Sequence, residues 1–389
     1  MGHRRKSPGG VLGVCVVLLL TGCTGGSPEP APEVSTTADP TDSLEQTVQR
    51  FIADGVSSVV VQVRWPGGEW SKGFGLRDPY GREPAQPQDR FSIGSVTKSM
   101  VAAATLQLVD DGLIALDDPV NAMLESFGAG LKPPTPITVR QLLNHTSGMP
   151  DYVQALEPTN PPQDVVSTSV SVQHGLELTA ALPWDWRNVG FFSYSNSNYL
   201  ALGQLVEKLR GRPLDDVLRE RVFGPLGLDR TSLSNRDRAA PDNLRAYMSV
   251  GGGRLEITQP EVVTGSPAGG VVSSTEDVND FYRGLLSGAL LSPGTLQEMK
   301  TVKSMNYGLG ITRFPDACSS SAYRYGHFGS VYGYLTSSIS SEDGSRQVTL
   351  AMALPTLPSE TPDPVTGRRI DQYISQMELA AQKTLDQLC

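Results

Sequence analysis

The chain has 389 residues, of which 39% are hydrophobic and 19% are charged, an ordinary balance for a globular protein with a sizeable core. Its formal net charge of -9 is opposite in sign to the basic surface of a nucleic-acid-binding protein. The four histidines are widely spaced and no C-x-x-C, H-E-x-x-H or P-loop pattern occurs, which argues against a dedicated metal or nucleotide site.

The N-terminal segment is predicted to carry a targeting signal and a tether. After a basic start, an apolar run at residues 11–20 is too short to span a bilayer but is typical of a signal peptide. The run leads into a Leu-Thr-Gly-Cys pattern that resembles a bacterial lipobox, so we expect removal of residues 1–22 and lipidation of Cys23. A plain secretory signal with a chance cysteine is the alternative. Residues 23–42, rich in Gly, Ser, Pro and Thr, predict a flexible tether that holds the protein at the outer face of the cytoplasmic membrane.

Residues 43–389 are predicted to form one folded domain. Helices are expected where apolar residues recur at helical spacing, and strands where apolar and β-branched residues cluster between turn signals. In chain order we expect a helix at 43–53, strands at 57–65 and 70–75, helices at 97–109, 138–143, 200–209, 214–222 and 275–286, strands at 332–340 and 347–354, and a final helix at 370–388.

Strands at both ends of the domain, with helices between them, indicate a discontinuous α/β (α+β) fold. The terminal pieces, residues 43–95 and 290–389, are expected to build one antiparallel sheet flanked by the N- and C-terminal helices. The inserted segment is expected to form a mainly helical lobe. A small-molecule site is expected in the cleft between the two lobes.

The first candidate catalytic pair stands at the start of the helix expected at 97–109. Ser95 and Lys98 are three residues apart, so they lie on one helical face and the lysine can reach the serine hydroxyl. A serine hydroxyl is a poor nucleophile until a neighbour accepts its proton, and a lysine does this when burial lowers its pKa. A helix start also supplies N–H groups for a developing oxyanion.

Tyr194 and Asn196 form the second pattern. A phenolate beside an ammonium group can act as a general base, because the positive charge lowers the pKa of the tyrosine. Asn196 offers a donor and an acceptor suited to an amide or ester substrate. Taken alone, a tyrosine packed in the core is the simpler interpretation.

The third pattern is His327, Phe328, Gly329 and Ser330, just before the strand expected at 332–340. The glycine lets a substrate backbone approach closely, and an N–H group of an edge strand can complete an oxyanion hole. Taken alone, a turn with a structural histidine is the simpler interpretation.

In this order and spacing, the S-x-x-K, Y-x-N and H-x-G patterns resemble the serine β-lactamase and penicillin-binding-protein family. The likeness is strongest to class C β-lactamases and to secreted D-alanyl-D-alanine carboxypeptidases of actinomycete type. Further segments with counterparts in the family are LLNHTSGM at 142–149, AGGVVSSTED at 268–277 and YGLG at 307–310. The resemblance covers residues 43–389.

The resemblance implies a role for each matching residue. Ser95 would be acylated, and Lys98 with Tyr194 would move the proton to the leaving group. Asn196 would bind the amide side of the substrate, and the N–H groups of Ser95 and Ser330 would form the oxyanion hole.

The number of remaining cysteines is consistent with an exported protein. Outside the signal and the lipobox stand Cys318 and Cys389, and an even pair suits an oxidising compartment. A disulfide between them would tie the last residue of the chain to the domain, and two free thiols are the alternative. Their positions also match the pair that the carboxypeptidases carry.

Two single positions, and the stretch at 182–188 before Tyr194, depart from the family pattern. Relatives that cleave D-Ala-D-Ala or β-lactams have a hydroxyl residue that helps to hold the substrate carboxylate, and this chain has Phe328 there. The arginine that the carboxypeptidases place after YGLG falls at Thr312 in this chain, with Arg313 beside it. Arg313 or Arg324 could supply the cation, and the sequence does not fix the orientation of either one.

The leading prediction is a D-alanyl-D-alanine carboxypeptidase-like amidase of the cell envelope that penicillin acylates at Ser95. An esterase or β-lactamase of the same fold is the alternative, and a non-catalytic envelope-binding lipoprotein is a further one. Phe328 favours the esterase, as do Trp184 and Trp186, which either belong to the core or wall a pocket for an apolar acyl group. A small-molecule or peptide substrate is expected, without cofactor, metal or nucleic acid, and no oligomeric state is predicted.

Overall fold

The computed structural model describes residues 39–124, 127–156, 161–233, 240–358 and 364–389. The predicted signal peptide, the lipidation site Cys23 and the tether as far as residue 38 lie outside the described residues. Within the described ranges, no helix combines the length and the apolar content needed to cross a bilayer. The same ranges contain no group of three or more histidine, cysteine or acidic side chains placed to hold a metal ion.

The element bounds are as follows. The helices are α1 (Asp42–Ala53), α2 (Thr97–Asp110), α3 (Val139–Leu143), α4 (Val153–Leu156), α5 (Pro162–Ser167), α6 (Val172–Ala180), α7 (Asn196–Arg210), α8 (Leu214–Leu218), α9 (Gly224–Leu226), α10 (Thr275–Leu286), α11 (Pro293–Lys300) and α12 (Pro364–Gln387). The strands are β1 (Ser58–Trp65), β2 (Gly68–Asp78), β3 (Glu83–Pro84), β4 (Phe91–Ser92), β5 (Tyr247–Val250), β6 (Gly253–Glu256), β7 (Val272–Ser273), β8 (Thr312–Pro315), β9 (Tyr323–Val331), β10 (Tyr334–Ser341), β11 (Gln347–Ala353) and β12 (Leu357–Pro358). A short turn of helix, η1 (Gly94–Val96), leads into α2.

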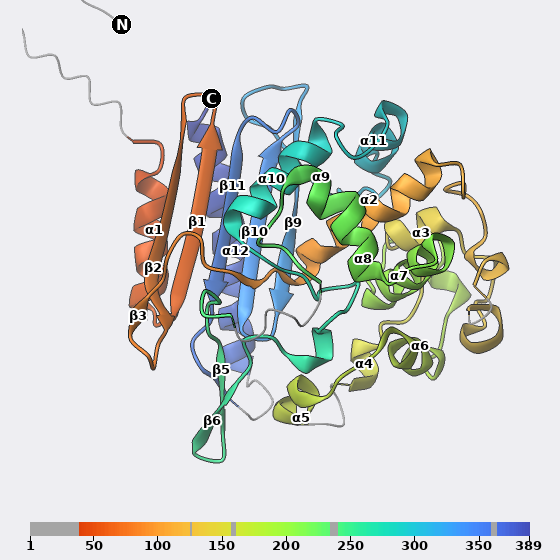
Figure 1. The fold of residues 1–389 in the computed structure, drawn as a ribbon, viewed down its shortest axis with the longest axis horizontal. Helices are drawn as coiled ribbons and strands as arrows, with labels where there is room; N and C mark the ends of the chain where they lie inside the picture. The colour runs from red at the N-terminus through yellow and green to blue at the C-terminus, as the bar shows by residue number, and fades with distance from the viewer. Residues whose placement is uncertain (1–38, 125–126, 157–160, 234–239, 359–363) are drawn as a thin grey trace, which may run out of the picture. The chain divides into compact units, whose positions relative to one another are not determined.

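Within the described residues, seven strands form one antiparallel sheet in the order β3-β2-β1-β11-β10-β9-β8. At its centre β1 pairs with β11, so that Ser58 lies opposite Ala353 and Val63 lies opposite Val348. Segments from opposite ends of the domain are therefore neighbours in one sheet (Figure 1). This confirms the antiparallel sheet expected from the two terminal pieces.

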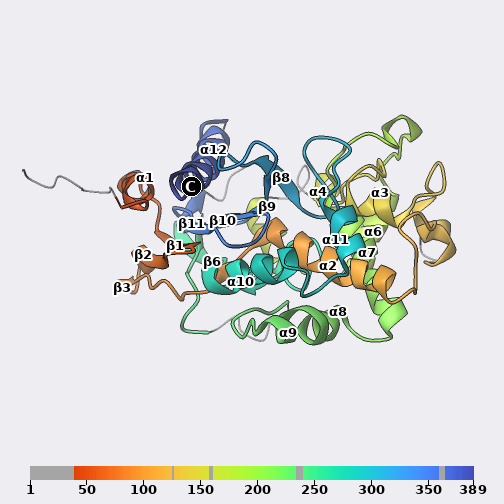
Figure 2. The ribbon, with the colours of Figure 1, turned by 90° about the horizontal axis from the view of Figure 1, so that it is seen from above.

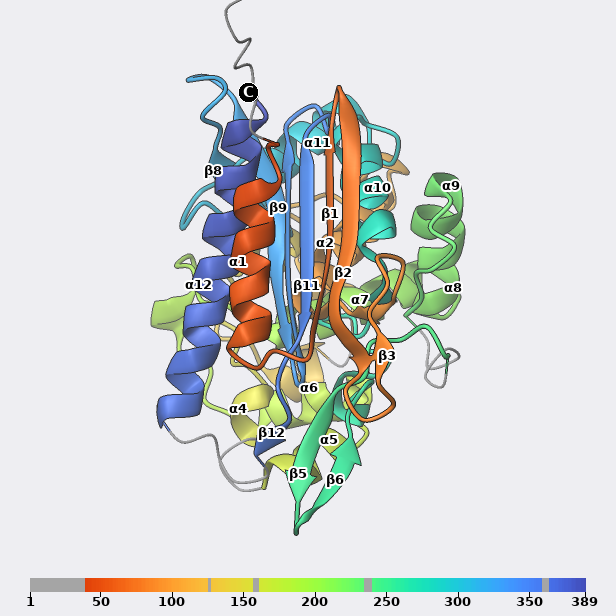
Figure 3. The same cartoon turned by 90° about the vertical axis from the view of Figure 1, so that its left-hand side faces the viewer.

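The two terminal helices lie side by side and cover one face of the sheet (Figure 3). In α1, Leu44, Val48 and Phe51 recur at helical spacing and are buried, so this stripe faces the strands. Phe51 meets Tyr373 of α12 edge to face, with ring centroids 5.8 Å apart. Together with Met377, these residues form an apolar cluster between the helices and the sheet.

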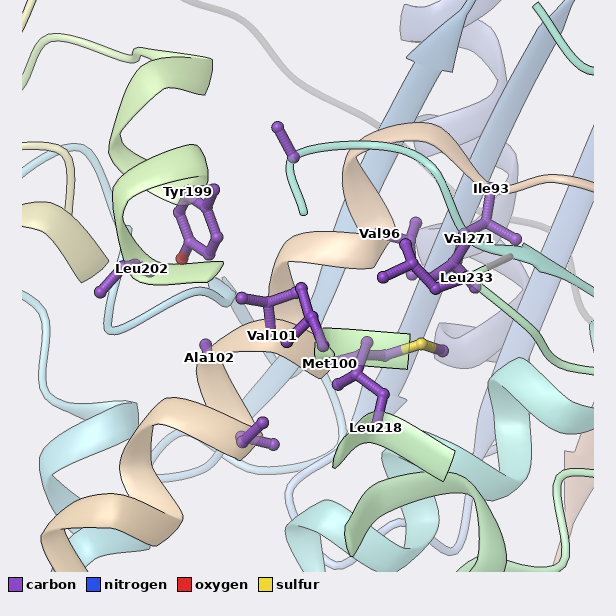
Figure 4. Close-up of a cluster of buried hydrophobic side chains, with 14 of the residues drawn as sticks. Ile93, Val96, Met100, Val101, Ala102, Tyr199, Leu202, Leu218, Leu233 and Val271 are labelled. Carbon is purple, nitrogen blue, oxygen red and sulfur yellow. The ribbon is translucent and has the colours of Figure 1, made fainter. Parts of the chain in front are cut away.

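The opposite face of the sheet carries the larger core and the inserted lobe (Figures 1 and 2). Helix α10 packs on β1, β10 and β11, and α2 packs against α7 and α8 in the lobe. Every residue of α2 from Thr97 to Leu108 is buried, because the helix is enclosed on all sides. Figure 4 shows Met100 and Val101 of α2 in this core with Leu218 and Val271. The enclosed helix fixes the segment in front of it, where Ser95 lies.

The segment around His327 lies inside β9, whereas the sequence analysis places it before the next strand. Glycine is rare in strands, and the two glycines of this segment conceal the strand pattern. Both glycines are required by close backbone contacts. A Cβ on Gly326 would lie 1.9 Å from the carbonyl oxygen of Ser338, and a Cβ on Gly329 would lie 2.0 Å from that of Ile93.

The inserted segment also contains a short hairpin, β5–β6, that the sequence analysis does not predict. Its turn holds Gly251 and Gly252, whose φ angles of +55° and +78° favour glycine. Strand β12 joins this hairpin in parallel and sets Leu357 opposite Met248. The pairing brings a residue that follows β11 next to a residue of the inserted segment.

A disulfide joins Cys318, in the loop between β8 and β9, to Cys389 at the end of α12. This confirms the disulfide predicted between these two cysteines. The bond closes a loop over a sequence separation of 71 residues, which restricts the unfolded chain. We expect the double variant Cys318→Ser with Cys389→Ser to lose about 2–4 kcal/mol of unfolding free energy in urea titrations. Equal urea midpoints of unfolding for the oxidised protein and the double variant would contradict this expected loss.

Candidate active site

Ser95 lies in η1, and this turn crosses close to β9. Gly94 has a φ of +53°, and a Cβ at this position would lie 2.9 Å from the nitrogen of Ser330. A Cβ on Gly329 would lie 3.3 Å from the nitrogen of Ser95. Glycine at both positions lets the two backbones approach each other. The structure thus brings together Ser95 and Ser330, whose N–H groups are the predicted oxyanion hole.

Lys98 is fully buried in the first turn of α2 and contacts Ser95, the predicted nucleophile. Its Nζ lies 3.0 Å from Oγ of Ser95, 2.8 Å from Oδ1 of Asn196 and 2.6 Å from the carbonyl oxygen of Ala268. Burial lowers the pKa of Lys98 to about 7, although the charge of the Asp151 carboxylate partly opposes this shift.

The neutral form of Lys98 has two N–H groups and one lone pair. The oxygens of Asn196 and Ala268 can only accept hydrogen bonds, so the two N–H groups point to them. The lone pair is then left for Ser95, whose hydroxyl can donate its proton to Nζ. This arrangement gives Lys98 the geometry and the pKa of a general base for Ser95.

Tyr194 lacks the lowered pKa that the sequence analysis expects. Burial raises the pKa of Tyr194, and a hydrogen bond with Ser95 offsets only part of this effect. Although 38% of the residue is exposed, its hydroxyl faces Ser95 inside the site. Its ring stacks on His145 with centroids 4.2 Å apart, and Nζ of Lys98 lies 5.0 Å from the ring centroid. Tyr194 is therefore a neutral phenol, suited to passing a proton rather than to acting as a phenolate.

Asp151, which was not predicted from the sequence, positions Asn196. One carboxylate oxygen of Asp151 accepts hydrogen bonds from the backbone nitrogen of Asn196, at 3.1 Å, and from its Nδ2, at 2.9 Å. With its amino group held there, the amide oxygen of Asn196 points to Lys98. Asp151 follows the turn at 146–148, but no spacing rule connects it to a residue 45 positions later. Its position after that turn is the only signal that the sequence offers.

The rate is expected to depend on the protonation of Lys98. We expect kcat/KM for an uncharged ester to fall about tenfold for each pH unit below about 7, because Lys98 gains a proton and loses its lone pair. In Asp151→Asn the negative charge that raises the pKa of Lys98 is lost, so the pH below which kcat/KM falls should be lower than in wild type. Asp151→Ala also removes the acceptor for Asn196 and should lower the plateau rate by about tenfold or more. If kcat/KM of Asp151→Asn fell at the same pH as in wild type, the charge of Asp151 would have no effect on the catalytic pKa.

His327 is affected by the charge of Lys98 but does not belong to the described residues that line the cavity near Ser95. Its Nδ1 donates to the carbonyl oxygen of Phe328 at 2.5 Å, and its Nε2 accepts from the hydroxyl of Tyr307 at 2.9 Å. Burial lowers the pKa of His327 to about 3, and the nearby Lys98 adds to the effect. The histidine is therefore neutral, and its predicted substrate contact stays a prediction.

Phe328 points to the opposite face of β9, since neighbouring side chains alternate along a strand. It packs with the apolar cluster under the terminal helices and is not among the described residues that line the cavity. The position therefore supplies neither a hydroxyl nor an aromatic wall beside Ser95. Its assignment to substrate binding remains an untested prediction.

Neither candidate arginine lines the cavity in the described part of the chain. Arg324 is 1% exposed and pairs with Asp316 at 2.9 Å and with Asp386 at 2.6 Å. Its guanidinium group is therefore held in structural ion pairs. Arg313, in β8, lies over the ring of Tyr323 at 4.2 Å from the centroid.

The two tryptophans also lie away from this cavity. Trp184 packs against the larger core and donates its indole N–H to the carbonyl oxygen of Ser147 at 3.2 Å. Trp186 is 68% exposed. Of the two interpretations left open, Trp184 fits the core, and neither residue is a cavity wall among the described residues.

A cavity of about 300 Å³ lies beside Ser95. Ser95, Asn196 and Ser330 line one part of it, which joins the predicted nucleophile, amide-binding group and oxyanion hole in one place. The structure therefore assembles three segments that the sequence analysis treated as separate patterns.

Comparison with known proteins identifies the class that this fold and site define. Residues 44–370 match the family model described as Beta-lactamase. Penicillin-binding protein 4 of Amycolatopsis lactamdurans is 32% identical over 213 residues, which cover 53% of this chain and 53% of that protein. The first curated relatives are covered over 37% to 60% of their own length.

Solved structures give the same result. A D-stereospecific amidohydrolase from a Streptomyces species has a TM-score of 0.69 at 26% identity, covering 80% of this chain and 94% of that one. A D-amino acid amidase from Ochrobactrum anthropi SV3 has a TM-score of 0.72 at 23% identity, covering 90% and 99%, a likeness that shows the fold. The fold is that of the penicillin-binding-protein-like and β-lactamase class. The chain belongs to the beta-lactamase family, which confirms the resemblance found in the sequence.

Proposed function

We propose that the protein is a serine hydrolase that cleaves amide or ester bonds through an acyl-enzyme on Ser95. The observation that carries this proposal is the contact between Oγ of Ser95 and Nζ of Lys98 at 3.0 Å, combined with a lysine pKa near 7. A protein that only binds its ligand has no need for a buried lysine of this kind, because taking the amine of the lysine out of water costs free energy.

The first half of the reaction forms the acyl-enzyme. Neutral Lys98 takes the hydroxyl proton of Ser95 while Oγ forms a bond to the substrate carbonyl carbon, and the oxyanion is held by the N–H groups of Ser95 and Ser330. The bond to the leaving group then breaks, and Tyr194 passes the proton from Lys98 to the leaving amine or alcohol. Water then takes the place of the leaving group, gives a proton through Tyr194 to Lys98 and attacks the acyl carbon. The bond between this carbon and Oγ breaks, Oγ takes the proton back from Lys98, and the carboxylic acid leaves.

Uncharged substrates are favoured over peptides that end in a carboxylate. A carboxypeptidase needs a cation for the terminal carboxylate of its substrate, and no charged side chain lines the described part of the cavity. Arg324 is held by two aspartates and Arg313 covers a tyrosine ring. We therefore place amidase or esterase activity before the carboxypeptidase activity that the sequence predicts. Lipid anchoring at the outer face of the membrane is part of the proposal and rests on residues 1–42 alone.

The test is covalent trapping of the nucleophile. The protein is mixed with 4-nitrophenyl acetate and, separately, with a fluorescent penicillin, and is then quenched in acid for peptide mass spectrometry. We expect an acetyl group on Ser95 and none in Ser95→Ala. Labelling by penicillin would place β-lactams among its ligands. No acetyl adduct and no turnover in a folded sample would overturn the proposal.

A further inference from the structure

The cavity beside Ser95 continues into an apolar chamber built by segments that are distant in the sequence. Met248 comes from β5, Leu357 from β12 and Ile370 from α12, and Val153 and Pro162 come from α4 and α5. The parallel pairing of β12 with β5 sets Leu357 opposite Met248, which closes this side of the chamber. An apolar space that communicates directly with a nucleophile is suited to a part of the substrate.

The catalytic geometry indicates which part of the substrate enters the chamber. Ser95 and Ser330, which hold the carbonyl group, line the cavity, whereas Tyr194, the donor to the leaving group, is not among its described lining residues. The leaving group therefore lies toward Tyr194, and the chamber lies on the acyl side of the scissile bond.

We propose that this chamber binds the acyl group of the substrate and selects uncharged, apolar acyl groups of medium length. The proposal rests on the proposed function, since it assigns a substrate class to the same serine. The whole cavity, which includes the part beside Ser95, has a volume of about 300 Å³. This corresponds to about ten groups of water size, enough for the reacting carbonyl group together with a six-carbon chain or a phenyl ring on a short linker.

The chemistry of the walls separates apolar acyl groups from charged ones. The described lining includes serines, an asparagine and tyrosines but no lysine, arginine, histidine, aspartate or glutamate. A carboxylate at the far end of an acyl chain would lose its hydration without gaining a cationic partner. Each methylene that the chamber removes from water should raise kcat/KM about fourfold.

The experiment compares 4-nitrophenyl esters of acetic, butyric and hexanoic acid with the monoester of adipic acid. We expect kcat/KM to be at least about tenfold higher for the hexanoyl ester than for the acetyl ester, and the adipoyl ester to lose this gain. Leu357→Trp and Ile370→Trp fill the chamber and should lower the ratio of hexanoyl to acetyl rates. Leu379→Trp, on the same helix as Ile370 but 52% exposed, is the matched control and should keep the wild-type ratio.

The outcomes distinguish the two proposals. Ser95-dependent acetyl hydrolysis with no gain for the hexanoyl ester, or with equal rates for the adipoyl ester, would overturn the acyl chamber and leave the hydrolase standing. If the tryptophan variants do not fold, the wild-type ester series still decides the matter. Absence of any ester turnover and of any adduct on Ser95 would overturn both.

Discussion

Replacing Lys98 with methionine is expected to lower kcat/KM for 4-nitrophenyl esters by at least about a thousandfold. The buried amine is the group in contact with Oγ of Ser95 that has a lone pair available near neutral pH. Methionine has a similar length and no basic nitrogen, so the serine hydroxyl would keep its proton during attack. The measurement is steady-state hydrolysis beside wild type, with folding checked by circular dichroism.

The matched control is Lys72→Met, because Lys72 is a surface residue whose amine pairs with Glu45 at 2.7 Å. Its removal should leave the rate within about twofold of wild type, since exposed ion pairs contribute little. Lys98→Met also leaves the oxygens of Asn196 and Ala268 without their donor, which costs some stability. A folded Lys98→Met variant that kept more than about a tenth of the wild-type activity would show that another group activates Ser95.

Replacing Gly329 with alanine is expected to lower kcat/KM by at least about a hundredfold. The new Cβ would lie 2.0 Å from the carbonyl oxygen of Ile93 and 3.3 Å from the nitrogen of Ser95. Contact at that distance forces β9 and η1 apart, so Ser330 moves away from the nucleophile and one oxyanion donor is lost. The clash should also lower the unfolding free energy by about 1–3 kcal/mol. Activity and urea unfolding are measured on the same preparation.

Gly253→Ala is the matched control for Gly329→Ala. It shows whether replacing a strand glycine with alanine lowers rate and stability at a position away from the active site. Gly253 lies in β6, and a Cβ there would meet only the carbonyl oxygen of Val250 at 3.5 Å, an ordinary contact. This variant should therefore match wild type in both rate and stability. If Gly329→Ala did so as well, the close approach of β9 to η1 would have no part in catalysis.

The three residues proposed for catalysis could be located from the sequence because each belongs to a short sequence pattern. Ser95 and Lys98 share one turn of helix, and their roles follow from helical geometry and from the chemistry of a buried amine. Tyr194 was located through its place in the family pattern, but the direction of its pKa was wrong. The sequence shows the nearby cation and does not show the burial that outweighs it.

The contacts between distant segments were not predictable in the same way. Asp151 holds Asn196, and Asn196 contacts Lys98, and each of these contacts joins residues far apart in the sequence. Strand β9 escaped detection because its two glycines serve backbone contacts with β10 and η1, which weakens the local signal for a strand. Once β9 is known to be a strand, alternation alone places Phe328 on the face away from Lys98.

The pairing of β1 with β11 has a consequence for the order of folding. β1 is made early, yet the strand that completes its second edge belongs to the last part of the domain. Until β11 has been synthesised, the β1–β2 hairpin has an open edge and the terminal helices have no complete surface to cover. Contacts of such long sequence separation make folding slow, because a large loop must close before they form. A chain interrupted before residue 347 would lack the strand between β1 and β10, so the two halves of the sheet would not be joined.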